Sequence, residues 1–362
     1  MSVGFLVLAL GALVVATAQP TTTGTRFEGF SYAGNVIGYV NMTMDYCDIK
    51  AAMAAGNFTE ALSIYSTGKN SFSGLARRTF FRFASYITAN GSVEPLHDSI
   101  LAGKDTSSLD AAIRAALADG KATLAAGLIQ VGTLKYHLHE VDEAYNKIKT
   151  YLADGTGNLT NLVSDASGAP HNVDEAWALW AGGAANNCGT LSGWASSLGA
   201  AMGTTFLGKS YVNTAMINTV NEMLAAARLS TLNIQAYDAA RTNEVRLLTL
   251  LGLQGVSVAA YTADAAAACK RPAAEVEDAK TMIAVHWAYL EPMLKLRNFK
   301  ASAVTELHHQ LTASKLSYKK VAAAVKGVLS AMGRRSSELG APQSAIIAAN
   351  WKCSSKTLRS IA

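Results

Sequence analysis

Three short segments place histidine beside carboxylate residues, a pairing that binds transition-metal ions. The densest is segment 137–143, in which Glu140 and Glu143 lie one helical turn apart. Carboxylates at that spacing can share a hard cation such as Fe(III). The other two segments are 286–291, with a histidine and a glutamate at its ends, and 306–309, which contains one Glu-x-x-His pattern.

Helix phase ranks these side chains, because each residue of a helix turns by about 100°. The apolar stripe along 124–152 places His137 on the flank of the buried face, and places His139, Glu140 and Glu143 further towards solvent. On the second helix, His286 and Glu291 lie beside the apolar stripe, and on the third helix His308 does. We therefore predict an iron site from the following residues, with Glu143 and His309 in reserve: His137, Glu140, His286, Glu291 and His308.

The competing interpretation is that these are structural histidines and surface ion pairs, with Glu143 paired to Lys147 one turn away. A ferritin-like di-iron centre needs two Glu-x-x-His motifs, and the second match, at 94–97, contains a proline. The sequence has no P-loop, His-Glu-x-x-His, Cys-x-x-Cys or Gly-x-Ser-x-Gly motif. We expect a protein that is not an enzyme, with a metal-dependent oxidase or carbonate-handling enzyme as the alternative.

The elements that carry these residues are predicted to be helices. Alanine is abundant, only 6 prolines occur, and few segments alternate at period two. We expect an all-α fold of two related antiparallel helical-bundle halves, 19–190 and 191–362, with a ligand cleft between them. Matches at an offset of 172 residues suggest an internal duplication. Helices are expected near 47–67, 71–89, 107–119, 124–152, 173–184, 210–228, 232–251, 275–299, 301–312 and 315–332.

The N-terminus and the cysteines indicate export. An apolar run over 3–15 is followed by small residues, which predicts a signal peptide at 1–18. Four glycosylation sequons precede residue 161, at Asn41, Asn57, Asn90 and Asn158. Four cysteines allow three disulfide pairings, and we favour Cys47–Cys188 and Cys269–Cys353 because each stays within one half. The uncharged stretch 247–263 is predicted to be a buried helix pair rather than a membrane span.

Charge is uneven along the chain. The net charge of +5 is too small to argue for nucleic acid binding, but segment 292–362 carries +10 and the remainder −5. A solvated basic face explains this most simply. Adhesion to an anionic cell wall, or attraction of an anionic ligand such as an iron chelate or bicarbonate, are the functional alternatives.

Two blocks, TRFEGFSYAGNVIGY at 25–39 and YCDIKAAMAAGNFTEAL at 46–62, resemble the iron-assimilation proteins of green algae, also described as high-CO2-inducible periplasmic proteins. The resemblance covers the whole chain. It implies a secreted protein of the periplasm or cell wall that captures Fe2+ or Fe3+, or an iron chelate. It also implies delivery towards a plasma-membrane iron transporter or ferroxidase. It supplies no ligand set for these residues.

Overall fold

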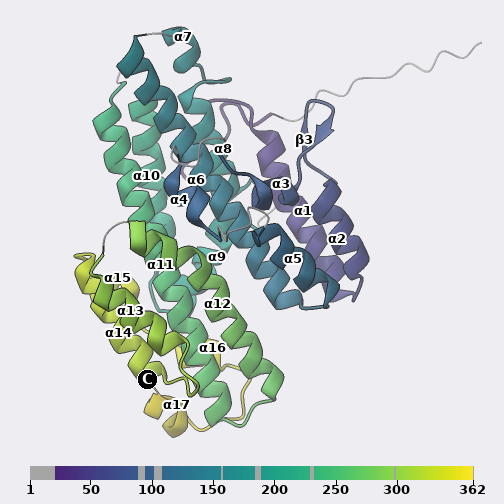
Figure 1. The fold of residues 1–362 in the computed structure, drawn as a ribbon, viewed down its shortest axis with the longest axis vertical. Coiled ribbons are helices and arrows are strands. Elements are labelled where there is room, and N and C mark those ends of the chain that lie inside the picture. Colours follow the sequence, from purple (N-terminus) through teal and green to yellow (C-terminus); the bar gives the residue numbers. More distant parts are fainter. Residues whose placement is uncertain are drawn as a thin grey trace, which may run out of the picture.

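A computed structural model describes residues 21–88, 94–101, 108–155, 158–183, 189–228, 232–296 and 299–361. The predicted signal peptide and the sequon at Asn90 lie outside these ranges. Within these ranges the fold is all-α, as predicted (Figure 1). Three two-stranded antiparallel hairpins in the same ranges precede helices. The hairpins are β1–β2 (Arg26–Phe27, Phe30–Ser31), β3–β4 (Phe72–Ser73, Ala76–Arg77) and β5–β6 (Thr205–Phe206, Lys209–Ser210).

Two long helices organise the packing, α6 (Ala122–Asp154) and α11 (Ile234–Ala268). The helices before and between them are α1 (Ile37–Ala54), α2 (Phe58–Thr67), α3 (Phe80–Ser85), α4 (Pro95–Ser99), α5 (Ser108–Ala118), α7 (Leu159–Leu162), α8 (Ala169–Ala181), α9 (Leu191–Ala201) and α10 (Tyr211–Ala227). The helices after them are α12 (Ala273–Leu296), α13 (Ala301–Leu311), α14 (Tyr318–Ala331), α15 (Ser336–Leu339), α16 (Ser344–Ile347) and α17 (Ser355–Ile361).

Helix α6 is enclosed by neighbours from both predicted halves. It packs against α3, α5 and α8 from the first half and against α11 and α12 from the second. The buried apolar residues form one cluster that runs from Phe30 to Ile361. The division into halves and their origin by duplication stay predictions.

The stretch 247–263 is the middle of the single helix α11, so the predicted helix pair is wrong. Its glycines provide close packing and do not break the helix. A Cβ on Gly252 would lie 3.0 Å from a Leu290 methyl, and one on Gly255 would lie 2.2 Å from Nδ1 of His286. Among the described residues, α11 is the one helix long and apolar enough to cross a membrane, but 83% of its most apolar window is buried inside the protein.

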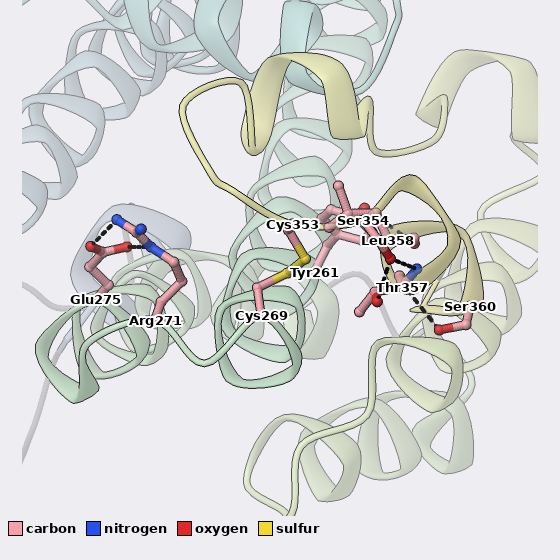
Figure 2. Close-up of a disulfide and its surroundings, with 9 residues drawn as sticks. All are labelled: Tyr261, Cys269, Arg271, Glu275, Cys353, Ser354, Thr357, Leu358 and Ser360. Atoms are coloured by element: carbon pink, nitrogen blue, oxygen red, sulfur yellow. Dashed lines mark hydrogen bonds and ion pairs between the residues drawn. A yellow bond between two sulfur atoms is a disulfide. The ribbon is translucent and has the colours of Figure 1, made fainter.

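A disulfide joins Cys269, at the end of α11, to Cys353, just before α17 (Figure 2). The Tyr261 hydroxyl lies 3.5 Å from the Leu358 carbonyl oxygen beside it. The disulfide between Cys269 and Cys353 confirms one of the two predicted pairs. The other pair ends on Cys188, which lies outside the described residues.

The basic C-terminal segment presents its charges to solvent. Its described lysine and arginine side chains are exposed, apart from the half-buried Arg334. The sequons differ in their surroundings: Asn57 and Asn158 are exposed, whereas Thr43 of the first sequon is buried inside α1. Glycosylation stays a prediction.

Candidate metal centre

The middle of α6 carries polar side chains that are buried, which corrects the predicted solvent-facing position of His139 and Glu140. Glu140 is 2% exposed and His139 is 4% exposed. A prediction from a single apolar stripe assumes that solvent covers the rest of the helix. Here α1, α3, α4 and α8 contact α6 as well, so polar residues of this helix need partners inside the protein.

Three side chains on consecutive turns of α6 form a group that could hold a metal ion. One ligand atom from each of His139, Glu140 and Glu143 lies within 4.8 Å of the others. Among the described residues, a search for three or more histidine, cysteine or carboxylate side chains within this distance finds these three. Imidazole with carboxylates suits divalent or trivalent iron.

The spacing of His139 and Glu143 fits adjacent positions on one ion. Nε2 of His139 lies 3.3 Å from Oε2 of Glu143. Two ligands about 2.1 Å from an ion and at right angles to each other lie about 3 Å apart. A neutral imidazole donates from one nitrogen alone. With Nδ1 of His139 turned to Glu94, a cation between Nε2 and the Glu143 carboxylate would satisfy both atoms.

Glu94 orients the imidazole from behind. Its Oε2 lies 2.8 Å from Nδ1 of His139, and the side chain is buried at the start of α4. Burial raises the pKa of Glu94, and the hydrogen bond from His139 opposes that rise. A carboxylate on the far nitrogen is the usual support of a metal-binding histidine, because it fixes the ring and its tautomer.

An open pocket of about 720 Å³ gives access to the group. Tyr86, Glu94, His139 and Glu143 line it together with Lys147. The predicted pair is present, with Nζ of Lys147 3.1 Å from Oε1 of Glu143. An incoming metal ion would replace this ammonium group as the counter-charge of Glu143.

Glu140 is the most deeply buried of the three side chains. One carboxyl oxygen accepts from the Tyr39 hydroxyl at 2.9 Å and the other from the Asn172 side chain at 2.7 Å. Burial, followed by the charge of Glu175, raises the pKa of Glu140 well above its ordinary range.

Four of the five predicted ligands have other surroundings. His137 is fully buried with its Nε2 hydrogen-bonded to the Glu244 carboxyl group, and its Nδ1 lies 2.8 Å from the Ala176 carbonyl oxygen. His286 is buried against Trp194, with its Nδ1 3.0 Å from the Tyr289 hydroxyl.

Glu291 pairs with Lys295 at 2.8 Å on the surface of α12. His308 is exposed and stacks on Trp287 at 5.1 Å, and His309 is exposed beside Gln310. Of the predicted residues, Glu140 and the reserve ligand Glu143 lie in the group. Sequence reasoning missed His139 as a ligand and Glu94 as its support. The i, i+4 spacing of His139 and Glu143 is the signal that could have found the first.

A family model described as low iron-inducible periplasmic protein, Fea1, matches residues 2–362. Comparison with curated proteins and with solved structures found no match.

Proposed function

Because the chain belongs to the family of low iron-inducible periplasmic proteins, we propose that this periplasmic protein captures extracellular iron at His139, Glu140 and Glu143. The iron is then passed towards a transporter in the plasma membrane. In this proposal the iron is cargo, and the protein catalyses no reaction.

The proposal rests on the 3.3 Å distance between Nε2 of His139 and Oε2 of Glu143, two side chains that line an open pocket. A site of two or three protein ligands leaves the remaining positions of an iron ion to water or to a chelating molecule. Such an ion can be exchanged, which suits a protein that must give up its cargo. Lys147 neutralises the Glu143 carboxylate until the ion replaces it.

The test is iron binding by the mature chain, residues 19–362. Iron content is measured by elemental mass spectrometry after gel filtration, and Fe(II) affinity by anaerobic competition with a chelator. We expect stoichiometric iron, and at least a tenfold weaker affinity in both His139→Ala and Glu143→Gln.

Two variants serve as matched controls, Glu291→Gln and His308→Ala, because these residues lie outside the group. Both should bind iron as the wild type does. The proposal fails if the double variant of His139 and Glu143 retains wild-type affinity, or if the wild-type protein binds no iron. Delivery is tested separately, by asking whether that double variant restores iron uptake in cells that lack the protein.

A further inference from the structure

A second cavity lies elsewhere in the first half of the chain. Its volume is about 650 Å³, and it shares no lining residue with the pocket at His139. Its walls are the start of α1, the β3–β4 hairpin and the first turns of α8. Three charged side chains reach it, from Arg78, His171 and Glu175.

Arg78 is an unpaired cation at this cavity. Its Nε is buried with no hydrogen-bond partner, and its guanidinium makes no ion pair with any described carboxylate. The guanidinium carbon lies over the Tyr39 ring, 4.0 Å from the ring centroid. Buried donors in folded proteins almost always have a partner, and the Nε–H of Arg78 is a buried donor without one.

The charge of Arg78 interacts with that of Glu175, although the two side chains form no direct ion pair among the described residues. Glu175 is the carboxylate of the cavity, and its Oε1 lies 3.3 Å from Nε2 of His171. Burial lowers the pKa of His171, but the Glu175 carboxylate outweighs it, so the pKa of His171 is raised overall. Glu175 is thus shared between His171 and Arg78, and the three side chains include two basic groups and one acidic group.

The start of α1 adds a further positive element. This helix of 18 residues has no side-chain cap at Val36 and no acidic residue in its first turn. Its first N–H groups are largely taken, since Ile37 N–H donates to Oδ1 of Asn35 and Tyr39 N–H to the Val36 carbonyl oxygen. The helix therefore contributes mainly its dipole, which favours an anion at this end. Gly38 brings the helix close to the guanidinium, because a Cβ there would lie 2.9 Å from Nε of Arg78.

We propose that this cavity binds a small planar oxyanion, a carboxylate or carbonate group, on the guanidinium of Arg78. The planar fork of an arginine matches two oxygens of such a group, whereas a lysine provides a single point of charge. The proposal does not depend on iron binding at His139. The group could belong to a free small anion or to the carboxylate arm of a larger ligand such as a metal chelate.

The experiment titrates the metal-free mature protein with acetate and with bicarbonate at constant ionic strength, using chloride as the reference anion. Binding is followed by calorimetry and by the rise in melting temperature. We expect saturable binding of at least one of the two anions, at least tenfold weaker in Arg78→Gln. Arg78→Lys, which keeps the charge and loses the fork, should also be weaker. Arg77→Gln, a neighbouring exposed arginine, should bind as the wild type does.

A second set of titrations uses citrate and ferric citrate. If they bind through Arg78 while acetate and bicarbonate do not, the cavity accepts the carboxylate of a larger ligand. The proposal is overturned if Arg78→Gln binds as tightly as the wild type, or if none of the probes binds. Circular dichroism verifies that each variant is folded.

Discussion

The buried pair of His137 and Glu244 offers the sharpest test of the structure, because His137 was predicted to be an iron ligand. Both side chains are fully buried, and the second carboxyl oxygen of Glu244 has no hydrogen-bond partner among the described residues. Replacement of His137 by leucine would leave the Glu244 carboxylate buried without its partner.

The expected cost follows from that burial. Removal of one member of a buried ion pair destabilises a protein by about 3–5 kcal/mol, because the remaining charge is uncompensated. Replacement of both members by apolar residues is often close to neutral. We therefore expect His137→Leu to lose about 3–5 kcal/mol, and the double variant His137→Leu/Glu244→Leu to regain most of that loss.

Urea unfolding followed by tryptophan fluorescence measures both values, since the Trp180 ring lies 5.8 Å from the His137 ring. A loss below about 1 kcal/mol in His137→Leu would refute the reasoning, as would a double variant no more stable than the single one. Iron binding by the folded double variant should equal that of the wild type. Loss of iron without loss of stability would instead restore His137 as a ligand.

Three further predictions concern pH, the disulfide and the pocket. Burial raises the pKa of Asp142 to about 6 and that of Asp174 to about 7. Both carboxyl groups therefore bind a proton on folding at pH values between the unfolded and folded pKa. The stability that they contribute is lost as the pH rises from about 4 to 7. The double asparagine variant should show a flatter fall in unfolding free energy over that range, and an equally steep fall would contradict this. Loss of the Cys269–Cys353 disulfide, which spans 84 residues, should cost about 4–5 kcal/mol in urea unfolding of a Cys269→Ser/Cys353→Ser variant, whereas an unfolding midpoint equal to that of the wild type would exclude such a role. Lys147→Met should tighten iron binding up to about fivefold, because its partly exposed ion pair no longer competes; weaker binding would show that the lysine supports the site.

Periodicity in the sequence predicted the helices well where the chain is long and amphipathic. The expected helices 124–152 and 275–299 correspond to α6 and α12. The expected helix 71–89 is wrong in its first part, because this segment begins with the β3–β4 hairpin. Gly74 adopts a positive φ of 60° at its turn, which a helix cannot include. The hairpin also lacks a buried stripe, so the three-and-four spacing there was accidental.

The site was less predictable, since it depends on contacts between distant residues. Helix phase found Glu140 and Glu143 but placed them towards solvent, because the sequence does not show which helices cover α6. The partners Tyr39 and Glu94 lie 101 and 45 residues away from the side chains that they contact. The position of His139 therefore becomes clear only once α4 is packed against α6.

The buried polar side chains of α6 also fix its register. Four of them, within two turns, contact side chains on three other parts of the chain. His137 and Asp142 meet Glu244 and Arg241 of α11, His139 meets Glu94 at the start of α4, and Glu140 meets Asn172 of α8. A shift of one residue would rotate all four by about 100° and leave several charges buried without partners. An apolar helix could slide with little penalty, but α6 cannot. Insertions and deletions during evolution should therefore be excluded from the interior of α6 and confined to the loops at its ends.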